Sequence, residues 1–120
     1  MPRDVGVYLE DIIDSIQQIR SYVVGVDWQA FESDRKTQDA VIRNLEVIGE
    51  AARNLPEDVL AFAPDIDWRK IIGLRNILIH EYFGVSLSIV WDIVQTKLGP
   101  LESGCRRLLK DADSGSEVAQ

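Results

Sequence analysis

The chain has 120 residues, enough for one domain with a single hydrophobic core. Hydrophobic residues make up 46% and charged residues 28%, the balance of an ordinary globular protein, which excludes wholesale disorder, collagen-like repeats and a disulfide scaffold. Thirteen Lys and Arg against 20 Asp and Glu give a net charge of −7, so bulk electrostatics would not hold the chain on nucleic acid. A nucleic-acid-binding role therefore requires a local basic site, which two chains could build together.

Cellular location is indicated by three features of the sequence. The single cysteine, Cys105, excludes an intrachain disulfide and a thiolate metal cluster, and its helical context predicts a small buried side chain rather than a nucleophile. The first residues lack the basic and then apolar pattern of a signal peptide. The longest apolar stretches fall far below the roughly 20 residues of a membrane span. We therefore expect a cytoplasmic protein without membrane contact.

The first half of the chain predicts two long helices. Apolar residues recur at spacings of three and four over residues 5–23, with Asp4 as the expected N-cap and Gly25 as the stop. A short turn at 28–31 and a polar segment at 32–36 precede a second helix, which should end near Pro56 because proline disfavours helix in the residue before it. The expected core positions of the two helices are Val5, Tyr8, Leu9, Ile12, Ile13, Ile16, Ile19, Val23, Val41, Leu45, Ile48 and Ala52.

A third long helix is expected from residue 68 to residue 82, capped by Asp67 after a turn at 57–62. Apolar side chains cover most of its circumference, so we expect it to lie deep in the bundle; they are Ile71, Ile72, Leu74, Ile77, Leu78 and Ile79. One polar stripe interrupts them, formed by Arg69, Gly73, Asn76 and His80. Gly73 costs about 1 kcal/mol of helix propensity relative to Ala, and its missing side chain would let another backbone or a ligand approach. The stripe indicates a site or an interface.

The last third of the chain is also expected to be helical. Gly84 marks a break, and Ser86 or Ser88 can cap the helix that follows. The Gly99–Pro100 pair either kinks this helix or begins a new one that runs to residue 109. The fold predicted is all-α: an antiparallel bundle of four to five helices in one domain over residues 1–110, followed by a polar, frayed tail at 111–120.

Arg75 and His80 both lie on the expected third helix, and helix geometry separates them. At about 100° per residue they differ by about 140°, so they meet only if the helix loosens near His80 or the Arg75 side chain curls around. A dimer offers a third arrangement, in which two chains contribute to one cleft. His80 is the only histidine of the chain, so acid–base work by two imidazoles would require a homodimer.

At these residues the sequence resembles the HEPN superfamily, and within it the HepT-like family. Arg75, His80 and Tyr82 reproduce the Arg-x4-His-x-Tyr signature of the superfamily. Residues 38–51 resemble the second-helix motif of the HepT-like branch, and residues 68–76, 82–85 and Trp91 continue the match. The resemblance covers roughly residues 5–110. The signature alone is short, but the second-helix motif and Trp91 in register with it make the match strong.

The resemblance implies a dimeric helical protein in which Arg75 and His80 line a cleft between subunits. Many HEPN proteins are metal-independent endoribonucleases, and HepT-like members act as toxins beside a minimal nucleotidyltransferase antitoxin that transfers AMP to the motif tyrosine, here Tyr82. In this reading His80 takes the proton from a ribose 2′-hydroxyl, Arg75 holds the phosphorane oxygens, and Asn76 orients the His80 ring or a phosphate. No cofactor and no metal ion is expected, because one histidine and scattered carboxylates do not make a metal site.

Each residue also has a structural reading. Arg75 alone is usually a salt-bridge residue, here to Glu46 or Glu50, and such a bridge could coexist with catalysis by positioning the guanidinium. His80 alone is more often a partner of the helix C-terminus, and Tyr82 a half-buried aromatic.

Two further groups of residues are expected to have structural rather than functional roles. The three tryptophans, Trp28, Trp68 and Trp91, are expected to be core or interface anchors. An acidic helix face of Asp39, Glu46 and Glu50 should be solvated or salt-bridged rather than metal-binding.

Three classes of function remain open. The chain is a ribonuclease toxin, a catalytically silent module that docks a nucleotidyltransferase, or a purely structural bundle. The acidic net charge counts mildly against the first class, although Arg69, Lys70 and Arg75 concentrate positive charge near the proposed cleft.

Overall fold

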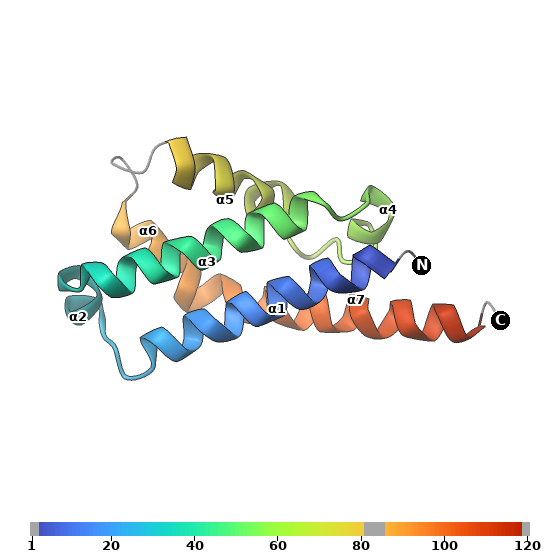
Figure 1. The fold of residues 1–120 in the computed structure, drawn as a ribbon, viewed down its shortest axis with the longest axis horizontal. Helices are drawn as coiled ribbons and strands as arrows, with labels where there is room; N and C mark the ends of the chain where they lie inside the picture. Colours follow the sequence, from blue (N-terminus) through green and yellow to red (C-terminus); the bar gives the residue numbers. More distant parts are fainter. Residues whose placement is uncertain (1–2, 81–85, 119–120) are drawn as a thin grey trace.

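The computed structural model describes residues 3–80 and 86–118, without the side chains of residues 3, 4, 77, 79, 80 and 112–118. Within these residues four long α-helices, three short ones and a π-helical turn build an elongated bundle of 53 × 29 × 21 Å, and no strand is present (Figure 1). Each long helix runs antiparallel to the one before it along the chain, and α3 lies between α1 and α5 (Figure 1). The all-α bundle expected from the sequence is confirmed.

Helix α1 (Arg3–Val23) buries the apolar stripe that its periodicity predicts. Its residues 5, 9, 12, 13, 16 and 19 are all less than 9% exposed, while Tyr8 and Val23 lie half-buried at the edge of the core. Gly25 has a φ of +72°, a left-handed conformation that glycine adopts without a Cβ clash, so it stops the helix as expected. The expected N-cap is wrong, because the chain is already helical at Asp4.

Helices α2 (Trp28–Ser33) and α3 (Arg35–Arg53) follow, each with an aspartate cap. Asp27 accepts a hydrogen bond of 2.9 Å from the backbone N–H of Ala30, and Asp34 accepts one of 3.1 Å from that of Thr37. With these two caps, helix forms where the sequence predicted a short turn and a polar segment. The core positions expected on α3 are buried, and the helix ends at Arg53, just before proline 56, as predicted.

Helix α5 (Trp68–His80) follows the short α4 (Glu57–Leu60) and begins where Asp67 accepts a bond of 3.3 Å from the N–H of Lys70, as expected. Its depth in the bundle was predicted wrongly. Helix α5 packs mainly on α3, at the outside of the bundle (Figure 1). Among its described side chains only Trp68 and Leu78 are buried, while those at 71, 72 and 74 stay half-buried.

The C-terminal helix is continuous but changes type. Helix α6 (Leu87–Asp92) passes through a π-helical turn (Ile93–Lys97) into α7 (Leu98–Val118), and the axis bends there (Figure 1). Pro100 has no N–H and crowds the carbonyl of Thr96, and the wider turn before it accommodates both. The Gly99–Pro100 pair therefore bends the helix rather than starting another. Helix α7 extends past residue 109, and the frayed tail stays a prediction.

The remaining caps and anchors of the bundle agree with the sequence in part. Ser86 is the N-cap residue of α6, although its hydroxyl lies 2.7 Å from that of Ser88 rather than bonding the backbone. The break expected at residue 84 lies outside the described residues. Glu102 of α7 pairs with Arg20 of α1 and, at 2.9 Å, with Arg106, and thereby ties the first helix to the last.

Candidate functional site

Arg75 leaves α5 on the side that faces α3, where a carboxylate meets it. Its Nε lies 2.8 Å from Oε2 of Glu50, with side-chain exposures of 36% and 49% respectively. The structure therefore selects Glu50 over Glu46 as the partner of Arg75. The guanidinium is paired through Nε, and about a third of the side chain remains open to solvent, so Arg75 can still contact a ligand.

The spacing between α3 and α5 is set by Gly49, a residue that the sequence analysis did not single out. A Cβ at Gly49 would lie 3.1 Å from the backbone nitrogen of Arg75, 3.1 Å from the carbonyl oxygen of Ile71 and 3.2 Å from Cβ of Arg75. The missing side chain thus lets α5 approach α3 at the turn that carries Arg75. The signal in the sequence was a glycine within an otherwise apolar helix face.

The opposite holds at Gly73, where a close approach was expected. No heavy atom of the described chain lies within 4 Å of a Cβ built at Gly73, which is half-exposed on α5. No atom of the described residues fills that gap. The polar stripe to which it belongs is open, since Arg69 and Asn76 are exposed as well.

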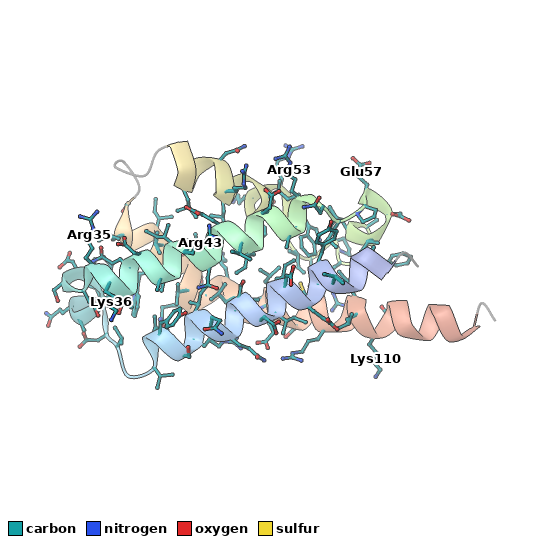
Figure 2. All side chains as sticks on the ribbon, in the orientation of Figure 1. Arg35, Lys36, Arg43, Arg53, Glu57 and Lys110 are labelled. Carbon is teal, nitrogen blue, oxygen red and sulfur yellow. The ribbon has the colours of Figure 1, made fainter. Side chains whose placement is uncertain are left out.

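A groove with a volume of about 470 Å³ lies along α3 and is flanked by α1 and α5. Helix α3 supplies most of the residues that line the groove, and one of them, Arg43, is labelled in Figure 2. The residues that line it are Tyr8, Asp11, Arg43, Glu46, Val47, Glu50, Ala51, Asn54 and Arg75. Two guanidinium groups and three carboxylates therefore share the groove, so its charge is mixed and not that of a basic phosphate channel.

The acidic face of α3 is salt-bridged, as expected. Oδ2 of Asp39 lies 3.9 Å from Nε of Arg35, and Oε2 of Glu46 lies 3.8 Å from Nη1 of Arg43. Glu50 belongs to the pair with Arg75. Across residues 3–80 and 86–118, no three His, Cys, Asp or Glu side chains that are described come together in a way that could hold a metal ion.

The structure describes His80 in part and does not describe Tyr82. His80 is the last residue of α5, its side chain is not among those described, and Tyr82 lies outside the described residues altogether. Helix α5 is α-helical as far as its last described residue, His80. The pairing of His80 with Arg75 therefore stays a prediction.

Cys105 and the tryptophans have structural roles, as expected. Cys105 is fully buried, and burial together with the nearby Glu102 raises the pKa of its thiol to about 12, so it is no nucleophile near neutral pH. The ring of Trp91 packs against Phe31 with centroids 4.9 Å apart and against Trp28 at 6.4 Å. The indole N–H of Trp68 donates a 3.1 Å hydrogen bond to the carbonyl of residue 63.

Comparison with known families decides what this bundle is. Residues 12–108 match the family described as Ribonuclease HepT-like. The chain belongs to this family. The HepT-like match spans α1 to α7, including Gly49, Glu50 and Arg75, and confirms the family resemblance that rested on residues 38–51 and the Arg-x4-His-x-Tyr signature.

Curated relatives of this HepT-like chain carry ribonuclease names. A chain of Methanocaldococcus jannaschii named as a candidate RNase is 41% identical over 118 residues, 98% of either chain. A protein of Thermococcus cleftensis named probable ribonuclease HepT is 40% identical over 110 residues, 92% of this chain and 100% of that one. A candidate RNase of Caldanaerobacter subterraneus is 35% identical over 103 residues, 86% of this chain and 92% of its own.

No solved structure matches the chain. Among the described residues, no helix combines the length and the apolar character that crossing a membrane takes.

Proposed function

We propose that this HepT-like chain is an endoribonuclease that cuts RNA at a cleft between two copies, with Arg75 and His80 as the catalytic residues. Family membership and the ribonuclease names of the relatives support the reaction class. The observation that carries the proposal is the setting of Arg75, which lines a groove, pairs with Glu50 at Nε, and has about a third of its side chain exposed.

The reaction is a transfer of the RNA phosphodiester to the neighbouring 2′-oxygen. Neutral His80 of one copy accepts the proton of the ribose 2′-hydroxyl, and the 2′-oxygen forms a bond to phosphorus as the bond to the 5′-oxygen breaks. The protonated His80 of the second copy gives its proton to the leaving 5′-oxygen. The products are a 2′,3′-cyclic phosphate and a 5′-hydroxyl. Arg75 stabilises the negative oxygens of the pentacoordinate phosphorane through its N–H groups, and Asn76 orients the imidazole or a phosphate. A base and a fixed positive charge supply what this reaction needs, so it requires no metal ion.

A homodimer is part of the proposal. One chain has one histidine, and positions 75 and 80 of an ideal α-helix differ by about 140°. The half-buried apolar side chains of α5 and the open position at Gly73 form a face that a second copy would cover. Covering it would bring the stripe of Gly73, Asn76 and position 80 in two copies toward each other.

The biological role that we propose is that of a toxin. A cognate minimal nucleotidyltransferase serves as antitoxin and transfers AMP from ATP to the hydroxyl of Tyr82, with loss of pyrophosphate. The added phosphate pairs with Arg75 and occupies the place of the RNA backbone, so the modification blocks the site without unfolding the bundle. Intact mass spectrometry after incubation with the nucleotidyltransferase, ATP and Mg²⁺ tests this step, because Tyr82→Phe should escape labelling.

RNA cleavage by the purified chain tests the activity. His80→Ala should abolish cleavage and growth inhibition and leave the helical circular dichroism unchanged, and EDTA should not affect the wild type. Cleavage by His80→Ala, or loss of wild-type cleavage in EDTA, would refute the mechanism.

A silent docking module is the second candidate. The net charge of −7 and the three carboxylates of the groove favour it. It predicts binding of the nucleotidyltransferase without any RNA cleavage by the wild type.

A further inference from the structure

We propose that Glu50 is a positioning residue for Arg75, acting together with Gly49, the residue before it on α3. This inference rests on the proposed ribonuclease function and assigns it a further residue. Glu50 holds the Nε edge of the guanidinium and so fixes the direction in which the remaining N–H groups point.

The ion pair with Glu50 is made through Nε of Arg75, not through the end-on fork that binds phosphate. A guanidinium has one N–H at Nε and four at its two Nη atoms, and the two Nη atoms form an end-on fork that matches two phosphate oxygens. The recorded ion pair uses Nε, at 2.8 Å from the Glu50 carboxylate. An arginine anchored at Nε therefore keeps the fork for a ligand, whereas a carboxylate across the fork would block it.

Gly49 fixes the other end of the same side chain. The backbone nitrogen and Cβ of Arg75 lie within 3.2 Å of the place where a Cβ at Gly49 would be. Two consecutive residues of α3 thus determine where Arg75 starts and where its guanidinium is held. Arginine has several rotatable bonds, so fixing both ends removes freedom that would otherwise have to be lost in the transition state.

Stability does not explain the pair. Both side chains are a third or more exposed, and exposed ion pairs contribute little to folding. Affinity for RNA does not explain it either, because Glu50 places a negative charge beside a site that must receive a polyanion. A residue that costs RNA binding and adds little stability fits a role in orienting the reacting group.

Glu50 positions Arg75 and also carries a negative charge, and losing each of these properties changes the kinetics of Glu50→Gln in the opposite direction. Loss of positioning should lower kcat by roughly tenfold, less than the roughly hundredfold that a 1 Å misplacement costs. Loss of a negative charge should leave the KM for RNA unchanged or lower. Glu50→Asp keeps the charge but reaches less far, so its kcat should lie between those of Glu50→Gln and the wild type.

Three control variants separate positioning from charge and from folding. Glu46→Gln removes the same charge from the same groove but belongs to the pair with Arg43. Asp65→Asn removes a carboxylate from another exposed pair, 3.1 Å from Arg107, and should leave kcat and KM unchanged. In an Arg75→Lys background, which has no Nε, Glu50→Gln should produce no further loss of kcat.

The test is steady-state cleavage of a short single-stranded RNA by the full chain, together with the NMR signal of the Arg75 Nε–H. A tenfold lower kcat with equal or tighter RNA binding, and a shifted Nε–H signal in Glu50→Gln, are the expected results. An unchanged kcat in Glu50→Gln, or an equal fall in Glu46→Gln, refutes the positioning role while the ribonuclease function stands. Absence of cleavage by the wild type refutes the proposed function and with it the role of Glu50.

Discussion

Replacing Gly49 by alanine should destabilise the fold, although alanine is the better helix former. The new Cβ would lie 3.1 Å from two backbone atoms of α5, those of Arg75 and Ile71, where about 3.5 to 4.0 Å is the comfortable separation. Backbone atoms cannot rotate away as a flexible side chain can. Helix α5 must therefore move outward by roughly 0.5 Å or the two helices must strain.

The size of the effect follows from two opposing contributions. Overpacking a well-packed contact costs about 1 to 3 kcal/mol, and alanine gains about 1 kcal/mol of helix propensity over glycine. The middle of these ranges gives a net loss of about 1 kcal/mol. Gly6→Ala on α1 is the matched control, since its Cβ would meet only Cδ1 of Leu109 at an ordinary 3.8 Å. The two variants should differ by about 2 kcal/mol, because the propensity gain is common to both.

Urea unfolding followed by circular dichroism at 222 nm measures this difference, and the chain concentration is kept equal in all samples. For a chain of this length the difference corresponds to roughly 6 to 10 °C in Tm. If Gly49→Ala is as stable as Gly6→Ala, then α5 has room to move, and the argument that Gly49 fixes the position of Arg75 fails.

Three further predictions concern other parts of the molecule. Gly73→Arg should stay folded, because nothing in the described chain lies near that position, and should turn a dimer into a monomer by light scattering; a persistent dimer would place the interface elsewhere. Burial alone would raise the pKa of the Glu102 carboxyl, but its bonds from Arg106 and Arg20 outweigh burial and lower it. The stability that this carboxylate contributes is therefore complete above its ordinary pKa of 4.5 and is lost as the pH falls through the lowered pKa. Stability against urea between pH 5 and 3 should then fall more steeply in the wild type than in Glu102→Gln. Cys105, with its raised pKa, should react with a thiol reagent at pH 7.5 no faster than the chain unfolds, and rapid labelling of the folded chain would contradict its burial.

Local features of the fold could be read from the sequence because short-range physics decides them. The 3.6-residue spacing on α1 identifies its buried face, the stop at Gly25 follows from glycine's freedom to adopt a positive φ, and Asp67 caps α5 through a bond three residues along. Pro100 was recognised as a point of irregularity, although the π-helical turn that accommodates it was not foreseen.

Features that depend on how helices meet could not be read in the same way. An apolar circumference indicates that α5 is covered but does not say whether the same chain or another covers it, so its depth was misjudged. Both Gly49 and Gly73 lie within helices, and only the packing of α3 against α5 shows which of them contacts a neighbouring helix. The choice of Glu50 over Glu46 as the partner of Arg75 depends on the same pairing.

The position of α5 at the outside of the bundle has a consequence for how the molecule opens. An element that packs mainly on one neighbour can separate while the rest of the structure stays closed, so its free energy of opening is below that of global unfolding. Backbone amides of α5 should then exchange with solvent deuterium sooner than those of α1 and α3, which are packed against each other and against further helices. A second copy bound over α5 would slow that exchange, so deuterium uptake would report assembly of the site in the resting protein, before any RNA is added.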